Sequence, residues 1–142
     1  MFKSQSQGKL IPSITMIDSD LDLLTSFRKV FHQFDAVKFF TMNDLWIGLL
    51  TASRYGADLI IAEICYPNAG FHDSEHDGHL IHTIRDVRPE AKIIICSNEA
   101  REEIIHRYLT QYQVDAYFKK TDSSILDVVR KSFELVGEPS PT

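Results

Sequence analysis

Short apolar strings alternate regularly with longer amphipathic segments along this chain, and few folds accommodate that pattern. Each of five strings is followed by a segment whose apolar residues recur at helical spacing. The strings lie at 14–17, 37–40, 59–62, 93–96 and 116–118, and the amphipathic segments at 21–34, 42–55, 78–87, 99–112 and 125–136. The pattern predicts a (βα)5 chain. Right-handed crossovers then favour a three-layer, doubly wound α/β domain with helices on both faces of a parallel sheet.

Polar residues near the start of three amphipathic segments predict where those helices begin. Short polar side chains can accept hydrogen bonds from the N–H groups of a first helical turn. The candidate N-caps are Ser19 or Asp20, Thr41 or Asn43, and Asp122 or Ser123. In the segment 99–112, the side chains expected to face the core are Ile104, Ile105, Tyr108 and Leu109.

Length and charge limit the classes of function open to this chain. Its 142 residues suffice for one domain, which we expect over 11–136, between a flexible tail at 1–10 and the start of a linker at 137–142. Fifteen Lys and Arg against twenty Asp and Glu give a net charge of −5. A phosphate backbone requires a concentrated positive face, so we expect no direct nucleic-acid binding by this domain.

The apolar segments and cysteines indicate the compartment. No apolar run approaches the roughly 20 residues of a membrane span, so we expect no membrane contact. The N-terminus is polar and lacks the apolar segment of a signal peptide. Two cysteines do not make a disulfide framework, and free thiols at Cys65 and Cys96 suit a reducing, cytoplasmic location.

Polar residues follow four of the predicted strands. The common strand order 2-1-3-4-5 places the carboxyl ends of the first and third strands at a switch point, where ligand sites form. Asp18-Ser19-Asp20 follows the first strand, Glu63 the third, Ser97 the fourth and Lys120 the fifth. Carboxylates so arranged suit Mg²⁺, whereas the Lys and Ser suit a charged oxygen group.

The motifs at these strand ends carry a family resemblance. They read IDSD at 17–20, LIIAEICYP at 59–67, IICSN at 94–98 and YFKK at 117–120. With them, the chain from 11 to about 136 resembles a response-regulator receiver domain, the aspartate-phosphorylated module of two-component signalling, and the resemblance implies a flavodoxin-like fold. It places Glu63 at the phosphoacceptor position, Asp18, Ser19 and Asp20 in the acidic pocket, and Ser97, Tyr117 and Lys120 at the hydroxyl, aromatic-switch and lysine positions.

The sequence departs from the receiver pattern at three positions. Glu63 replaces the acceptor Asp, Ser19 replaces the second acid of the pair, and Thr121 replaces a proline that often follows the Lys. A longer acceptor moves its carboxylate in a site that must align metal, nucleophile and phosphoryl group. We therefore expect a degenerate receiver that works without phosphorylation. Mg²⁺ binding by Asp18 and Glu63 is expected to be weak or absent, and no other cofactor is implied.

The resemblance also suggests how such a domain signals. Glu63 and Lys120 are expected to form a permanent ion pair like that of a phosphorylated acceptor, with the orientation of Tyr117 left open. The domain would then be a non-enzymatic signalling module that binds a protein partner, most simply as a homodimer through the segments 99–112, 116–118 and 125–136. Its output would be a fused or separate DNA-binding domain controlling transcription. The long loop after the third strand is similar to that of receivers carrying a LuxR-type helix-turn-helix.

Other interpretations remain open at the level of sequence. One is a working, Mg²⁺-dependent phosphoacceptor receiver, and a more remote one is a flavodoxin-like enzyme on the same fold. The flavodoxin-like enzyme requires a phosphate-binding loop after the first strand, where the acidic residues at 18–22 would repel an anion. The histidine-rich stretch 72–82 is interpreted as a solvated loop rather than as a metal site.

Overall fold

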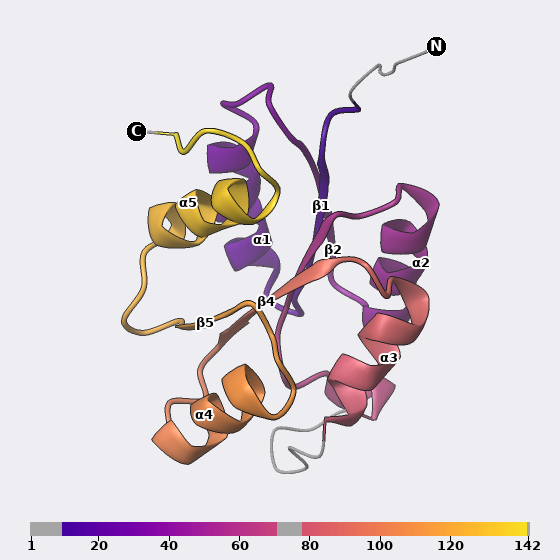
Figure 1. Ribbon diagram of the computed structural model, residues 1–142, viewed down its shortest axis with the longest axis vertical. Helices are drawn as coiled ribbons and strands as arrows, with labels where there is room; N and C mark the ends of the chain where they lie inside the picture. Colours follow the sequence, from indigo (N-terminus) through magenta and orange to yellow (C-terminus); the bar gives the residue numbers. More distant parts are fainter. Residues whose placement is uncertain (1–9, 71–77, 142) are drawn as a thin grey trace.

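A five-stranded parallel sheet forms the centre of the molecule (Figure 1). The computed structural model describes residues 10–70 and 78–141. The strands are β1 (Ser13–Ile17), β2 (Lys38–Met42), β3 (Leu59–Ala62), β4 (Lys92–Ser97) and β5 (Ala116–Lys119). The helices are α1 (Leu21–Phe31), α2 (Leu45–Arg54), α3 (His79–Val87), α4 (Glu102–Thr110) and α5 (Ile125–Leu135), with a short 3-10 helix η1 (Pro67–Ala69) after β3. The sheet order β2-β1-β3-β4-β5 confirms the predicted doubly wound topology.

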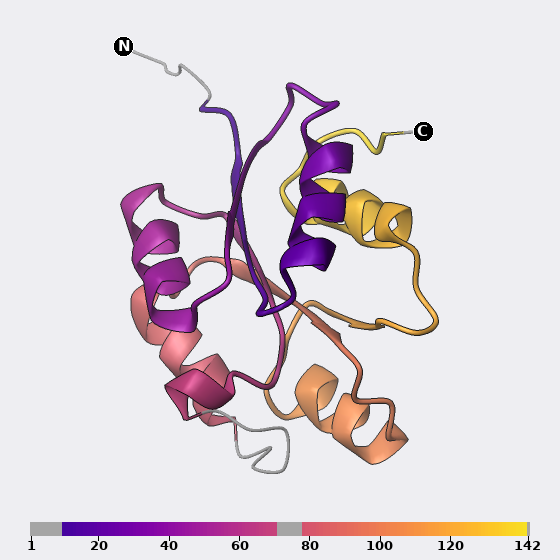
Figure 2. The same ribbon diagram turned by 180° about the vertical axis from the view of Figure 1, so that it is seen from behind.

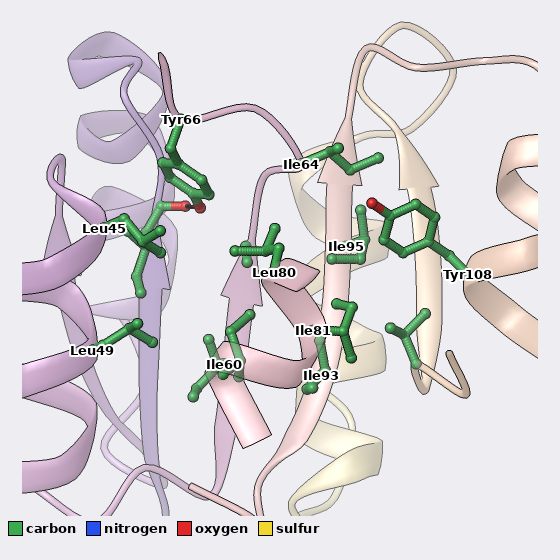
Figure 3. Close-up of a cluster of buried hydrophobic side chains, with 14 of the residues drawn as sticks. Leu45, Leu49, Ile60, Ile64, Tyr66, Leu80, Ile81, Ile93, Ile95 and Tyr108 are labelled. Carbon is green, nitrogen blue, oxygen red and sulfur yellow. Dashed lines mark hydrogen bonds between the residues drawn. The ribbon is translucent and has the colours of Figure 1, made fainter. Parts of the chain in front are cut away.

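Helices cover both faces of the sheet, as the alternation of apolar segments predicts (Figures 1 and 2). α1 and α5 lie against one face, where Phe27, Phe31 and Phe133 pack together in one buried cluster. α2, α3 and α4 contribute to a second cluster, in which Leu49, Ile81 and other apolar side chains meet β3 and β4 (Figure 3). Side chains of the inner strands β1, β3 and β4 therefore alternate between two cores, which is why β3 is apolar throughout and most residues of β1 and β4 are apolar as well.

α2 approaches β1 unusually closely. Gly48 lies on the inner side of α2, and a Cβ atom at this position would lie 2.6 Å from Cγ1 of Ile17. Ile17 is the last residue of β1 and is fully buried. The absence of a side chain at Gly48 thus lets α2 pack directly over the strand that ends at the polar cluster predicted from the sequence.

Two of the three predicted N-cap residues differ from those in the structure. The predicted cap Asp20 is confirmed, because its side chain accepts a hydrogen bond from Leu23 N–H. The predictions for α2 and α5 are wrong, since Asp44 and Ser124 cap them instead. Each true cap lies one residue after a predicted candidate, where the extended backbone directs a side-chain oxygen toward the first turn.

The face of α4 also differs in part from the predicted one. Ile104 and Tyr108 are buried, Ile105 is half-buried, and Leu109 is exposed. The core-facing stripe of α4 (Glu102–Thr110) is therefore narrower than the predicted one, because Leu109 lies within the helix but on its solvent side. Among the described residues no helix is long and apolar enough to cross a membrane. The predicted N-terminal tail lies outside these residues except for Leu10.

Candidate functional site

The carboxyl ends of four strands bring Asp18, Glu63, Ser97 and Lys120 to one edge of the sheet. Asp18 and Glu63 directly follow β1 and β3, Ser97 ends β4, and Lys120 directly follows β5. The backbone continues the strand pairing at this edge, because Lys120 N–H donates to the carbonyl of Ser97 at 2.8 Å. Parallel pairing therefore places side chains far apart in the sequence next to one another, as the sequence predicts.

Lys120 links the two carboxylates of this site. Its Nζ lies 2.8 Å from Oε2 of Glu63, which confirms the predicted ion pair. It also lies 2.8 Å from Oδ2 of Asp18, a contact that the sequence analysis does not include. The side chains are 15% exposed for Lys120, 10% for Glu63 and 2% for Asp18, so the three charges interact largely away from bulk water.

The remaining carboxylate oxygens are bound to the backbone. Asp18 Oδ1 accepts a hydrogen bond from Asp20 N–H at 2.9 Å. Glu63 Oε1 accepts one from Ile64 N–H at 2.7 Å. Each of the four carboxylate oxygens therefore has a donor within the protein, and both side chains are held in fixed orientations.

Burial and the neighbouring charges shift the pKa values of Lys120 and Asp18. Burial alone would lower the pKa of Lys120, but its hydrogen bonds to Asp18 and Glu63 and their negative charges raise that pKa above the ordinary value. Burial raises the pKa of Asp18, and Lys120 and Asp20 N–H offset only part of the increase. The pKa of Asp18 rises in spite of the nearby ammonium because Asp18 is the most buried of the three charges and also lies near the carboxylate of Glu63.

Ser19 and Asp20, which the resemblance places in an acidic pocket, are exposed. Asp20 is used as the N-cap of α1, where its side chain accepts from Leu23 N–H at 3.1 Å. Of the three consecutive residues, the structure brings only the side chain of Asp18 into contact with Lys120. The acidic pair is thus reduced to one carboxylate.

Tyr66 belongs to the site although the sequence analysis assigns it no role. Its buried hydroxyl donates to the carbonyl of Ile17 at 2.5 Å and accepts from Glu63 N–H at 2.8 Å. Burial raises the pKa of Tyr66 well above its ordinary value, so the phenol stays neutral. The hydroxyl ties the end of β1 to the residue after β3, and Figure 3 shows the ring next to Leu45. The tyrosine three residues after Glu63 and just before Pro67 is the signal that could have identified it.

Ser97 and Tyr117 both connect to the loop that precedes α4. The buried hydroxyl of Ser97 accepts from Glu99 N–H at 3.1 Å. The hydroxyl of Tyr117 donates to the carbonyl of Glu99 at 2.8 Å, and its ring centroid lies 6.0 Å from that of Tyr108. Tyr117 is therefore directed inward, toward the core beneath α4. The sequence left this orientation open.

The residues present do not fit a divalent metal well. Within residues 10–70 and 78–141 no group of three or more His, Cys, Asp or Glu side chains could hold a metal ion. Asp18 and Glu63, the predicted ligands, instead share the ammonium of Lys120. A cation approaching both carboxylates would have to displace that ammonium or accept its repulsion.

The other candidates from the sequence are the histidine-rich stretch and the two cysteines. His82 lies 3.7 Å from Asp86 on the exposed side of α3, while residues 72–77 of the histidine-rich loop lie outside the described residues. Cys65 is half-buried and Cys96 is buried, and both thiols are free. Burial raises the pKa of Cys96 to about 12, which makes it a poor nucleophile.

Comparison with known proteins places this architecture among known folds. The sequence matches no protein-family model and no curated protein. A signal receiver domain of an HD domain-containing protein from Pseudomonas fluorescens Pf-5 superposes with a TM-score of 0.74 at 14% identity, covering 91% of this chain and 89% of that one. A CheY-like response regulator receiver domain from Methanospirillum hungatei JF-1 gives 0.71 at 20% identity, with 90% and 96% covered.

A third similar structure is described as DNA-binding. It is a DNA-binding response regulator of the LuxR family from Staphylococcus aureus, with a TM-score of 0.70, 18% identity, and 87% of this chain and 98% of that chain covered. All three identities are low, so these similarities concern the backbone and not the site. The chain has the fold of response-regulator receiver domains.

Proposed function

We propose that this chain is a receiver-like signalling domain that acts through protein–protein interaction without being phosphorylated. The observation that carries the proposal is the position of Lys120, whose Nζ lies 2.8 Å from both Glu63 and Asp18. In a receiver of the usual pattern the equivalent Lys would interact with a phosphorylated Asp. Here the longer Glu63 supplies a permanent negative group to that Lys, so the ion pair exists without a phosphoryl donor.

The state of Glu63 supports this proposal. One carboxylate oxygen accepts from Ile64 N–H and the other interacts with Lys120. Attack on a phosphoryl group requires an aligned oxygen and neutralisation of the transferred charge by metal. In residues 10–70 and 78–141, Asp18 is the only other acid whose carboxylate pairs with the Lys120 ammonium, and Ser19 offers no second carboxylate. Both requirements are therefore poorly met.

The inward position of Tyr117 gives the site a connection to the surface. Tyr117 binds the carbonyl of Glu99 directly ahead of α4, and Ser97 binds the N–H of the same residue. We propose that this arrangement holds the loop before α4 in one conformation without phosphorylation. The partner is expected to be a second copy of the chain. A DNA-binding output domain, as named for the LuxR-family neighbour, is the proposed effector.

Phosphorylation is the first test. The purified chain is incubated with Mg²⁺ and a small-molecule phosphodonor, and its intact mass is measured with and without acid treatment. We expect no mass gain. The matched control is the double variant Glu63→Asp/Ser19→Asp, which restores both family carboxylates and should gain acid-labile phosphate. A stoichiometric gain in the wild type that Glu63→Gln abolishes would establish the alternative, a working phosphoacceptor.

Metal binding is read on the same samples. Millimolar Mg²⁺ is expected to leave the amide resonances near residues 18–20, 63 and 97 almost unmoved in the wild type, because the Lys120 ammonium already lies against both carboxylates and offsets one of their two charges. The double variant should show larger shifts, since it offers an added carboxylate. Saturable wild-type shifts at sub-millimolar Mg²⁺ would contradict the proposal.

A further inference from the structure

α2 lies at the outside of the molecule (Figures 1 and 2), and the face that it turns to solvent is uncharged. No residue from 45 to 53 is charged. On the outer side Trp46 is 48% exposed, Ile47 53% and Leu50 70%. Tyr55, just after the helix, is 51% exposed. Four of the eight large hydrophobic side chains exposed in residues 10–70 and 78–141 therefore lie at this one helix.

This apolar face continues into a groove. The groove runs between α2 and α3 and is lined by Trp46, Leu49, Leu50, Ser53, Asp86 and Val87. A continuous apolar helix face beside a groove is typical of an interaction site and unusual for a surface that meets only water. Gly48 explains why the residues point outward, because its close approach to β1 fixes which side of α2 faces the core.

The charges at the two ends of α2 indicate what covers the face. Asp44 caps the N-terminal end, and Arg54 is the last helical residue. A two-fold axis near the middle of the helix would place Arg54 of one copy opposite Asp44 of the other, with the two Leu50 side chains close to the axis. The uncharged stretch between the ends would then meet an uncharged stretch. An antiparallel pair of α2 helices is thus complementary in both charge and polarity.

We propose that Trp46, Ile47 and Leu50 form a self-association face through which two copies of this chain pair by antiparallel packing of α2. The inference deepens the proposed function, since it assigns a surface to the partner binding that the function requires. It also replaces the surface expected from the family resemblance. On α4 the exposed side carries Glu102, Glu103 and His106, with Leu109 as an isolated apolar residue.

One helix face buries less area than a permanent dimer usually does. Stable interfaces bury about 1,200–2,000 Å² in total, and smaller ones are transient. We therefore expect a reversible dimer in the micromolar range or weaker, whose population depends on protein concentration.

The test is sedimentation velocity on the full chain over a series of concentrations. Leu50→Glu should weaken dimerisation about tenfold or more, because it buries a charge at the centre of the pair. Leu109→Glu is the matched control, also an exposed Leu on a surface helix, and should change the dimer constant less than about twofold. Circular dichroism on each variant verifies that the helices remain.

A charge exchange tests the orientation of the two helices. Arg54→Glu should weaken the dimer, because it places acidic groups opposite Asp44. Adding Asp44→Asn should restore part of the affinity, since Asn removes the repulsion and still caps a helix. A parallel or unrelated pairing would show no such rescue, which would overturn the proposed geometry.

Two outcomes would overturn the inference as a whole. One is a wild-type chain that stays monomeric at every concentration, which would mean that the α2 face does not bind a second copy. The other is a dimer lost in Leu109→Glu and retained in Leu50→Glu. Neither outcome affects the phosphorylation test at Glu63, and phosphate uptake at Glu63 would in turn leave the assignment of α2 intact.

Discussion

Lys120 controls the charge balance at the strand ends, because it is the cation shared by two largely buried carboxylates. Its position after β5 and that of Glu63 after β3 follow from the order of the strands. That is why the Glu63–Lys120 pair could be predicted from the strand order together with the family resemblance. The contact with Asp18 and the hydroxyl bridge from Tyr66 could not, since both depend on the backbone path after β1 and β3.

Removing the cation should therefore destabilise the protein. In Lys120→Met two carboxylates face each other without a positive partner, and we expect a loss of about 3 kcal/mol in the free energy of unfolding. Lys120→Met/Glu63→Gln should recover roughly 1–2 kcal/mol of this loss, because one buried charge is gone and the amide oxygen still accepts from Ile64 N–H. Urea denaturation at pH 7 measures both values. Equal stability of wild type and Lys120→Met would show that the ion pairs contribute nothing.

At the scale of elements, the sequence predicts the existence and order of helices well and their ends less well. Apolar spacing fixed the core-facing residues Ile104 and Tyr108 of α4 correctly but extended the stripe to Leu109, which is exposed. Caps were predicted from residue type, whereas the backbone at Asp44 and Ser124 decides which neighbouring oxygen reaches the first turn. Helix ends depend on such local backbone geometry, and the spacing of apolar residues gives no information about it.

The contact between α2 and β1 gives a prediction at this scale. Gly48→Ala would improve helix propensity by up to about 1 kcal/mol in an open position. Here the added methyl would lie 2.6–2.9 Å from three carbon atoms of Ile17, which is fully buried. Overpacking of this kind costs about 1–3 kcal/mol, so we expect a net loss of stability.

A double-mutant cycle on thermal or urea unfolding isolates this contact. Ile17→Ala alone should cost about 2–4 kcal/mol through the cavity it leaves. Gly48→Ala in that background should be neutral or stabilising, because the atoms that it would meet are absent. A loss of the same size in both backgrounds would mean that the effect of Gly48→Ala does not arise from Ile17.

At the scale of the whole molecule, alternating apolar and amphipathic segments were sufficient to predict a doubly wound parallel sheet, and its order is the common one for such sheets. Parallel strands and right-handed crossovers leave few arrangements for such a chain. The fold in turn buries several groups and raises their pKa values, so that they keep their protons to higher pH than in an unfolded chain. Tyr66 and Tyr117 are kept neutral by burial, Cys96 likewise, and Lys120 is kept charged by its two carboxylate partners.

These groups predict a loss of stability in alkaline solution. The pKa of each is higher in the folded chain than its ordinary value, which is 9.0 for Cys96, 10.0 for the two tyrosines and 10.5 for Lys120. Above those values the unfolded chain loses protons that the folded chain retains, so the free energy of unfolding falls as pH rises. The contribution of Lys120 is fully present below pH 10.5 and is lost as pH rises through its folded pKa.

Urea denaturation between pH 7 and pH 11 should therefore show a decline that begins near pH 9 and steepens above pH 10. Tyr66→Phe removes one of the protons retained on folding, so its curve should be less steep above pH 10 even though it loses two hydrogen bonds and is less stable at pH 7. Tyr55→Phe is the matched control, because it removes a phenol that lies half in solvent. Parallel alkaline slopes for wild type and Tyr66→Phe would show that the phenol bridging β1 and β3 is not held neutral by the fold.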